Sequence, residues 1–321
     1  MPINSESTTL VSVIITTFNE SRTIVTLLQA LERQTLPPAE IIIVDADSPD
    51  GTGDIVTQFA KKSSLNIRLF SLTGNRSVGR NLALQKAKYS LLAITDAGCI
   101  PEKNWLEQLV KKQLKTQAAV IAGYYKGIAT TSFEEASIPY TLVMPDRINE
   151  NTFLPATRSM LMTKAVWQKL KGFDESLSDN EDYDFARRLQ QQKISIAFAK
   201  NAIVSWQPRS NLRDFFSMLF RFARGDAQAG LFRPKVALLF FRYVLLLGAS
   251  LVILYFLEPK FVLKLWVPLG VLYGMWAVDK NVRYAPKSWL WLPVLQYTAD
   301  AAVLAGTLAG LATRTRKIIF G

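Results

Sequence analysis

The chain has 321 residues, a formal net charge of +12, one cysteine and no histidine. Without histidine, zinc sites built on histidine, Ser-His-Asp triads and histidine general bases are excluded. A single cysteine, Cys99, leaves no intrachain disulfide. Any acid–base chemistry must therefore use carboxylates, lysine, tyrosine or Cys99.

Apolar residues and positive charge are distributed unevenly along the chain. Residues 1–235 carry 29 Lys+Arg against 23 Asp+Glu, and residues 236–321 carry 9 against 3, so each part has a net charge of +6. The hydrophobic excess collects in the shorter second part. An apolar, basic segment is typical of a membrane region with cationic flanks, and we expect no nucleic-acid partner.

The first hundred residues alternate between short apolar strands and amphipathic helices. Strands are expected at Leu10–Thr16, Ile41–Val44, Ile67–Phe70 and Leu91–Thr95, and helices at Ile24–Leu31, Ile55–Lys62 and Arg80–Ala87. This alternation predicts an α/β fold with a mostly parallel sheet and helices on both faces. Pro101 is suited to start the next helix, which runs from Trp105 to about Thr116.

The following elements are less regular. Three prolines break residues 126–160 into expected loops and short helices over the site. Strands are expected at Ala118–Tyr124, Met160–Thr163, Ile194–Phe198 and Ala202–Trp206, and helices at Lys164–Leu170 and Asn180–Gln191.

Carboxylates follow two of the predicted strands. Asp45 and Asp96 come directly after apolar runs, and the carboxyl ends of parallel strands form the edge where ligands bind. Together with the basic pair Arg76 and Arg80, such carboxylates suit a divalent cation, Mg²⁺ or Mn²⁺, and a polyphosphate. Asp96 taken alone is equally consistent with capping of the next turn.

Five motifs, in order, resemble the family 2 glycosyltransferases with a GT-A fold over residues 10–206. They are the opening strand and turn Val11–Glu20, the acidic turn Asp45–Thr52, Gly79-Arg80-Asn81, Thr95-Asp96-Ala97-Gly98 at the place of an Asp-x-Asp metal motif, and Glu181-Asp182 with Asp184, Arg187 and Arg188.

The resemblance implies roles for particular residues around a nucleoside-diphosphate sugar. Contacts to the nucleoside are implied for Thr16, Glu20, Asp45 and Asp47, with Arg76 and Arg80 near the phosphates. Asp96 would hold the metal, and Asp182, beside Glu181, would take the proton from the acceptor hydroxyl. The implied activity is sugar transfer with inversion.

The resemblance has two gaps. Gly98 stands where the metal motif has its second Asp, and the Gln-x-x-Arg-Trp motif of processive synthases is missing at residues 207–211. The second gap favours transfer of a single sugar over polymerisation. For Glu181 and Asp182 an acidic pair that caps a helix stays open as the alternative, with Arg187 or Arg188 as the partner of Glu181.

The chain after residue 206 predicts a membrane anchor. Residues 207–235 read as a basic amphipathic interfacial segment, and 236–257, 261–278 and 289–311 as apolar segments long enough to span a bilayer. Pro293 and Asp300 interrupt the last of these. A third span would also put Arg314, Arg316 and Lys317 outside, although positive charge favours the cytoplasmic side, so two and three spans both stay open. A buried globular helix pair is the alternative.

These observations predict four regions: a flexible N-terminus (1–9), a GT-A catalytic domain (10–206), the interfacial segment (207–235) and the membrane domain (236–321). The N-terminus lacks a secretory signal, so we expect a multi-pass protein of the cytoplasmic membrane with its catalytic domain in the cytoplasm. The expected acceptor is lipid-linked or another glycan, and membrane lipids are expected partners. A catalytically silent sugar-nucleotide-binding scaffold is the rival reading. A transporter is disfavoured because the membrane part is short.

Overall fold

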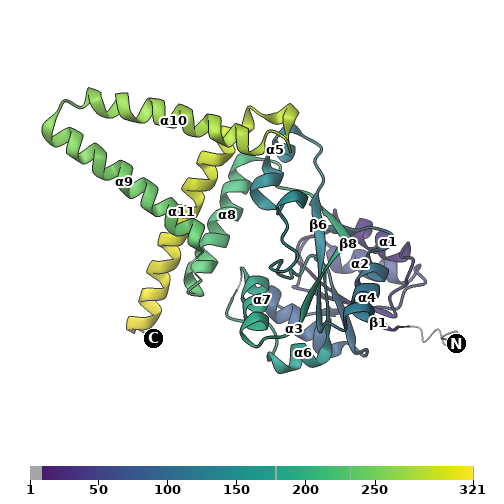
Figure 1. The fold of residues 1–321 in the computed structure, drawn as a ribbon. Coiled ribbons are helices and arrows are strands. Elements are labelled where there is room, and N and C mark those ends of the chain that lie inside the picture. The colour runs from purple at the N-terminus through teal and green to yellow at the C-terminus, as the bar shows by residue number, and fades with distance from the viewer. Residues whose placement is uncertain (1–8, 178, 232, 321) are drawn as a thin grey trace. The chain divides into compact units, whose positions relative to one another are not determined.

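The computed structural model describes residues 9–177, 179–231 and 233–320. Most of the predicted flexible N-terminus lies outside the described residues. The chain forms two compact units (Figure 1): the first runs to Lys126 and resumes at Met144–Gln207, and the second combines Gly127–Val143 with the chain from Pro208 onward. This boundary differs from the predicted 10–206 domain, because an internal segment belongs with the C-terminal helices.

The first unit is built on a mixed sheet that, within the described residues, has eight strands in the order β3-β2-β1-β4-β7-β6-β8-β5. The strands are β1 Val11–Thr17, β2 Glu40–Asp45, β3 Ile67–Ser71, β4 Leu91–Ile94, β5 Cys99–Pro101, β6 Val120–Gly127, β7 Met160–Thr163 and β8 Ile196–Trp206. The first four pair in parallel. β7 is antiparallel to β4 and β6, and β5 is antiparallel to β8.

Helices cover both faces of this sheet, as predicted. On one face lie α1 (Ile24–Glu32), α2 (Thr52–Ala60) and α4 (Trp105–Thr116), and on the other lie α3 (Arg76–Lys86), α6 (Lys164–Lys169) and α7 (Glu181–Gln191). Side chains alternate along β1: Val13 and Ile15 belong to the first core, and Ile14 to the second. Burial on both faces explains why the parallel strands read as continuous apolar runs.

Two element predictions are wrong. Pro101 does not begin a helix but ends β5, an outer strand of the sheet. At this edge its missing N–H does not interrupt the backbone hydrogen bonds of a central strand. The two late strands are one strand, β8, because the polar pair Lys200-Asn201, which suggested a turn, lies exposed within a continuous strand.

The second unit is helical. It contains α5 (Ser132–Thr141), α8 (Leu212–Gln228), α9 (Pro234–Phe256), α10 (Lys260–Asn281) and α11 (Trp291–Phe320). Short 3₁₀ turns lie at Pro145–Arg147 in the first unit and at Pro286–Ser288 in the second. α5 begins with a capping box between Thr131 and Glu134, which stabilises its first turn although Pro139 lies near its end.

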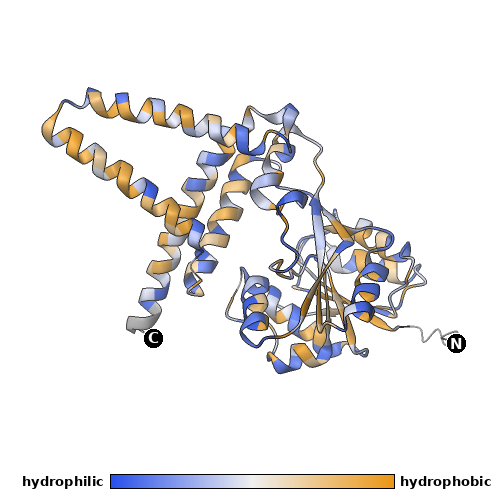
Figure 2. Cartoon of the chain, in the orientation of Figure 1, coloured by the Kyte–Doolittle hydropathy of each residue, from blue (hydrophilic) through white to orange (hydrophobic). Residues whose placement is uncertain are grey.

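Three of these helices are long and apolar enough to cross a membrane: Pro234–Phe256, Lys260–Asn281 and Trp291–Arg316, with mean hydropathies of 2.3, 1.6 and 1.2. Figure 2 colours much of the α9 and α10 ribbons orange, for hydrophobic residues. The third candidate is 39% buried, against 6% for the first. It packs on α8 through Gly306 and Gly310, where a Cβ would stand 2.3 and 2.4 Å from the carbonyl oxygens of Phe220 and Arg224. Only glycine permits so close a helix contact.

A buried polar cluster joins the three apolar helices at Asp300 of α11. Its carboxylate is 2.6 Å from the Arg242 guanidinium of α9 and accepts hydrogen bonds from Tyr243 (3.0 Å) and from Tyr273 of α10 (2.9 Å). Gln296 donates to the second carboxylate oxygen at 3.0 Å. Inside an apolar segment an ionised carboxylate is costly unless it is paired, so these contacts explain how the segment tolerates Asp300.

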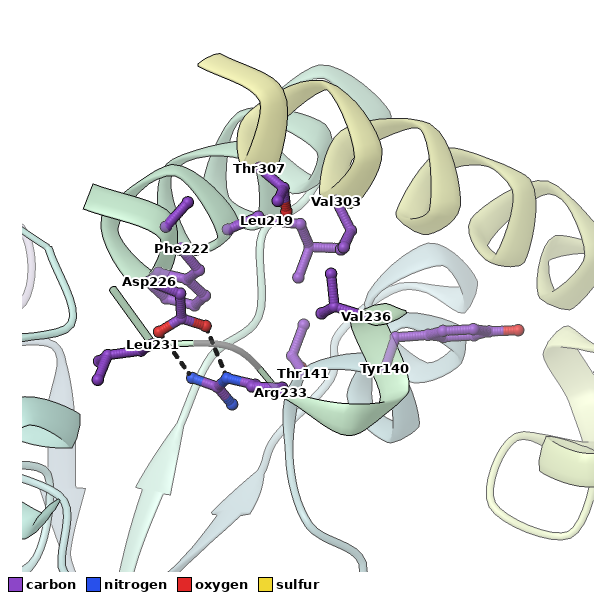
Figure 3. A pocket seen from close by; sticks show the side chains of 12 residues that line it. Tyr140, Thr141, Leu219, Phe222, Asp226, Leu231, Arg233, Val236, Val303 and Thr307 are labelled. Carbon is purple, nitrogen blue, oxygen red and sulfur yellow. Dashed lines mark hydrogen bonds and ion pairs between the residues drawn. The ribbon is translucent and has the colours of Figure 1, made fainter. Parts of the chain in front are cut away.

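The second unit also encloses a largely apolar pocket of about 230 Å³, formed by residues of α5, α8, α9 and α11 (Figure 3). Leu219, Phe222 and Val303 line it, and an ion pair between Arg233 and Asp226, with a nitrogen–oxygen distance of 2.6 Å, lies at one side. Val236, in the first turns of α9, contributes to the wall, so the pocket adjoins the start of the first candidate span.

Candidate active site

The predicted site residues gather at the carboxyl edge of the parallel strands in the first unit. Asp45 ends β2, Thr16 and Thr17 end β1, and Asp96 follows β4 by two residues. Because β1 lies between β2 and β4, Asp45 and Asp96 flank the end of β1. The prediction that both carboxylates lie at one sheet edge is therefore confirmed.

Asp45 is buried, and both of its carboxylate oxygens accept hydrogen bonds. One carboxylate oxygen accepts from the Thr17 hydroxyl at 2.7 Å and the Ser48 hydroxyl at 2.6 Å, and the other accepts from the Ser48 backbone N–H at 2.9 Å. Thr17 and Asp45 are register partners on neighbouring strands. These contacts fix the acidic turn that follows β2.

Beyond Asp45 the surface forms an open hollow of about 420 Å³, whose lining includes Asp47, Gly53 and Ser71. Asp47 has a positive φ of 54° and accepts hydrogen bonds from the Ser71 and Thr73 hydroxyls. Those bonds lower the pKa of Asp47, so it stays ionised at neutral pH. The hollow offers room for a nucleoside beside two predicted contact residues.

The carboxylate of Glu20, three residues after β1, lies close to Gly98. A Cβ built on Gly98 would meet only the Glu20 Oε2, at 4.0 Å. The missing second Asp of the metal motif thus leaves open space, with the Glu20 carboxylate at its border. Thr16 lies nearby on β1, where its methyl group would be 3.3 Å from a Cβ at Gly79 in α3.

Arg80 holds the centre of the site together. Its side chain is 1% exposed, and its guanidinium donates to Glu181 at 2.8 Å and to Asp96 at 3.3 Å. It also stacks on Phe173, 5.1 Å from the ring centroid. Arg76, one turn earlier on α3, is exposed. The structure therefore separates this basic pair, with only Arg80 joined to the carboxylates.

The partner of Glu181 is Arg80, not Arg187 or Arg188 as the sequence suggested. Arg188 instead pairs with Asp184 at 2.7 Å and donates to the carbonyls of Leu170 and Gly172. Glu181 is 5% exposed in its side chain. The ion pair between this buried carboxylate and the buried Arg80 guanidinium joins the first turn of α7 to α3.

Asp182 lies partly buried beside this pair. Burial, and then the negative charge of Glu181, raise the pKa of Asp182 above its ordinary value, although Arg158 and Arg80 act in the opposite direction. The helix N-terminus alone would lower the pKa of Asp182, so burial and the charge of Glu181 outweigh the helix dipole here. A raised pKa makes Asp182 a stronger base than an exposed aspartate.

Cys99, the other group left open by the composition, is buried in the core. Burial raises the pKa of its thiol, and the charge of Asp96 raises it further. A thiol that stays protonated is neither a nucleophile nor a base. The carboxylates are left as the acid–base groups of this site.

Sequence reasoning missed Arg158, a partly buried residue just before β7. Its guanidinium lies over the rings of Trp206 and Tyr125, 4.9 and 5.4 Å from their centroids. The only signal was the pairing of β7 with β4, which brings together residues 66 to 72 positions apart, such as Ile94 with Met160 and Leu91 with Thr163, and cannot be read from strand propensities.

The residues fit a divalent cation that is shared with a substrate. Among the described residues, no group of three or more His, Cys, Asp or Glu side chains is arranged to hold a metal ion. Asp96, with its side chain 36% exposed, is the accessible carboxylate. Mg²⁺ is often held by one or two carboxylates together with water and substrate phosphates. The site also has an excess of negative charge for a cation to balance, because it contains the four acids Glu20, Asp96, Glu181 and Asp182 but only the two arginines Arg80 and Arg158 among these residues.

Comparisons with known proteins agree with this geometry. Residues 12–171 match the model of Glycosyl transferase family 2. Glycosyltransferase AglE from Haloferax volcanii is 25% identical over 227 residues, covering 68% of this chain and 73% of that protein. Dolichyl N-acetyl-alpha-D-glucosaminyl phosphate 3-beta-D-2,3-diacetamido-2,3-dideoxy-beta-D-glucuronosyltransferase from Methanococcus voltae is 25% identical over 221 residues, covering 64% and 69%.

The fold has a solved counterpart. Mannosyltransferase PcManGT from Pyrobaculum calidifontis, solved in complex with GDP-Man and Mn²⁺, matches with a TM-score of 0.61 at 17% identity, over 95% of this chain and 87% of that one. This likeness identifies the sheet as a GT-A fold. The chain therefore belongs to glycosyl transferase family 2, and the protein is a glycosyltransferase whose GT-A fold is followed by three helices able to span a membrane.

Proposed function

We propose that the protein transfers one sugar, with inversion, from a nucleoside-diphosphate sugar to a lipid-linked acceptor at the cytoplasmic face of the membrane. The observation that carries the proposal is the cluster at the end of β4, where buried Arg80 joins Asp96 to Glu181 beside the more basic Asp182. The open hollow beside Asp45 adds a place for the nucleoside.

In this proposal the two sides of the site bind different parts of the donor. Thr16, Glu20, Asp45 and Asp47 surround the nucleoside. Asp96 would hold Mg²⁺ or Mn²⁺, which when bound neutralises charge on the diphosphate. Arg80 acts by fixing Asp96 and Glu181, because its guanidinium is already engaged by both. Exposed Arg76 remains as a cation at the rim.

The chemical step follows from the placement of Asp182. Asp182 accepts the proton of the acceptor hydroxyl, whose oxygen forms a bond to the anomeric carbon. The bond from that carbon to the diphosphate oxygen breaks, and its electron pair leaves with the nucleoside diphosphate. Attack opposite the leaving group inverts the configuration. Positioned acid–base help of this kind is worth about 10²–10⁴-fold in rate.

A lipid-linked acceptor is supported by the second unit and by one relative. The Methanococcus voltae relative is named for a dolichyl phosphate-linked acceptor. The second unit offers three apolar helices and an apolar pocket that adjoins the first of them. Membrane lipids are then the immediate partners of α9 and α10.

The test is transfer of a radiolabelled sugar to solvent-extractable lipid. Purified protein is incubated with labelled UDP-, GDP- or dTDP-sugars, Mn²⁺ and total membrane lipid. We expect label in the organic phase with one of the donors. Label that enters only water-soluble glycan would contradict the lipid-linked acceptor but keep the transfer reaction. Sugar nucleotide binding without any transfer would favour a silent scaffold.

Asp96 should act through the metal. Asp96→Asn keeps the size of the side chain but removes the charge that a hard cation prefers. We expect Mn²⁺-dependent donor binding to weaken about tenfold or more, measured by isothermal titration, while the melting temperature stays near the native value. Glu102→Gln, which removes one side of an exposed ion pair with Lys126, is the control. Unchanged metal dependence in Asp96→Asn would remove Asp96 from this role.

The orientation of the membrane helices is a separate prediction. Positive charge before residue 236 and around residues 279–288 favours a cytoplasmic location for both. A reporter fused at Leu257 should lie outside, and one fused at Ser288 should lie in the cytoplasm. A reporter fused at Gly321 should lie outside if the chain has three spans. An external signal at Ser288 would refute the orientation, and an internal signal at Gly321 would reduce the spans to two.

A further inference from the structure

Arg158 occupies a position that the sheet itself defines. The antiparallel ladder of β4 and β7 pairs Leu91 with Thr163 and ends with Ile94 opposite Met160. Arg158 precedes Met160 by two residues and lies in the turn that the bridged residues Ala156 and Ser159 close. Asp96 follows Ile94 by two residues on the other strand. The end of the β4–β7 ladder therefore brings Arg158 and the carboxylate that is proposed to hold the metal to the same edge of the sheet.

The backbone that carries Arg158 is held rigidly by its neighbour, Ser159. The Ser159 hydroxyl accepts from the Trp105 indole at 2.9 Å and donates to the Ala202 carbonyl at 3.1 Å. Its carbonyl accepts from the Gly123 N–H at 2.8 Å. Ser159 is fully buried, so Arg158 is presented from a fixed point.

Two aromatic rings then orient the Arg158 side chain. The guanidinium lies over Trp206 and Tyr125, and Trp206 is the register partner of Cys99, next to Gly98. The rings thus hold the cation beside the gap left by the second Asp of the metal motif. Stacking uses the flat face of a guanidinium and leaves the N–H groups at its edge free to donate.

Among the described residues, no carboxylate lies within 4.0 Å of the Arg158 guanidinium as an ion-pair partner. Burial alone would lower the pKa of Arg158, but Asp96 in the first place, with Tyr125, Cys99 and Asp182, raises it above its ordinary value. The charged guanidinium therefore faces the metal side and the base side of the site without being neutralised by either.

We propose that Arg158 binds the sugar-linked phosphate of the donor's diphosphate and stabilises the charge that develops there as the glycosidic oxygen leaves. This inference rests on the proposed function. It gives the site a second cation on the diphosphate, beside a metal motif that has lost one carboxylate. Planar, two-pronged hydrogen bonding to phosphate is what distinguishes arginine from lysine in this position.

The test compares diphosphates with monophosphates. Isothermal titration with Mn²⁺ measures UDP against UMP and GDP against GMP on the full chain, as wild type, Arg158→Gln and Arg158→Lys. Hydrogen bonds to charged groups predict diphosphate binding about 10–100-fold weaker in Arg158→Gln. Monophosphate binding should stay within about twofold, because the lost contact is to the phosphate that monophosphates lack. The diphosphate affinity of Arg158→Lys should lie between those of the wild type and Arg158→Gln. If Arg158→Gln does not fold, Arg158→Lys serves as the test variant.

Other outcomes would overturn the proposal. Arg33→Gln, on the exposed end of α1, is the matched control and should change nothing. If Arg158 binds the acceptor's phosphate instead, diphosphate affinity will be native in Arg158→Gln and the acceptor KM will rise. If Arg158 only supports its two rings, the melting temperature will fall with diphosphate affinity unchanged. If wild-type protein binds no nucleoside diphosphate, the proposed function itself fails.

Discussion

Asp182→Asn should lose acceptor transfer by about 10²–10⁴-fold while the donor and the metal bind normally. The substitution keeps the shape of the side chain but replaces the basic carboxylate with a neutral amide, which does not take up the acceptor's proton. Steady-state transfer rates and donor titrations on the same preparation separate the two effects. Asp174→Asn, in the exposed turn before α7, is the control and should transfer at the native rate. Native rates in Asp182→Asn would move the base elsewhere in the pocket.

The same residue predicts two dependences on pH. Because the pKa of Asp182 is raised in the fold, the base becomes protonated at a pH above about 3.9, the ordinary aspartate value. Transfer should therefore fall on the acid side at a higher pH than a normal aspartate would give. A raised native pKa also means that ionised Asp182 costs stability once the pH rises through it. Asp182→Asn should melt at the native temperature or above it at neutral pH.

Arg80→Met should be the most destabilising single change in the site. It leaves Glu181, whose side chain is 5% exposed, as a buried carboxylate without its partner and frees Asp96. Breaking a buried ion pair from one side costs about 3–5 kcal/mol, which chemical denaturation of the purified protein can measure. Donor binding should also weaken, because Asp96 and α7 lose their common anchor.

A second substitution distinguishes this cause from a simple loss of packing. In Arg80→Met with Glu181→Gln the buried charge is gone, so part of the stability should return, and a double-mutant cycle gives the coupling. Lys111→Met breaks an exposed ion pair with Glu107, and about 0.5 kcal/mol or less is expected there. Equal losses in Arg80→Met and Lys111→Met would show that the buried pair is not what joins α3 to α7.

The parallel half of the sheet could be predicted because its signals are local. Each of its strands is a run of apolar residues, and Asp45 and Asp96 mark where two of the runs end. The antiparallel half depended on pairings that no local pattern encodes, such as β5 with β8. Pro101 was assigned to a helix because its edge position on β5 is not visible in sequence.

The site shows the same division. Motifs located Asp45, Asp96, Glu181 and Asp182, since each lies at a strand end or a helix start. The partner of Glu181 was assigned wrongly because helical spacing favours Arg187 and Arg188, whereas the partner, Arg80, comes from α3, 101 positions earlier. Arg158 was missed because its place depends on the β4–β7 register.

The most direct test of the account is the thermal stability of the purified protein with sugar nucleotides, in the presence of Mn²⁺ or of a chelator. Binding at about 100 times the dissociation constant adds about 2.7 kcal/mol to the folded state, which corresponds to a rise of about 5 °C or more in melting temperature. We predict that sugar nucleotides of one base raise the melting temperature with Mn²⁺ and lose most of this effect with the chelator. No rise with any UDP-, GDP- or dTDP-sugar, or an equal rise without metal, would contradict a metal-assisted donor site at Asp96.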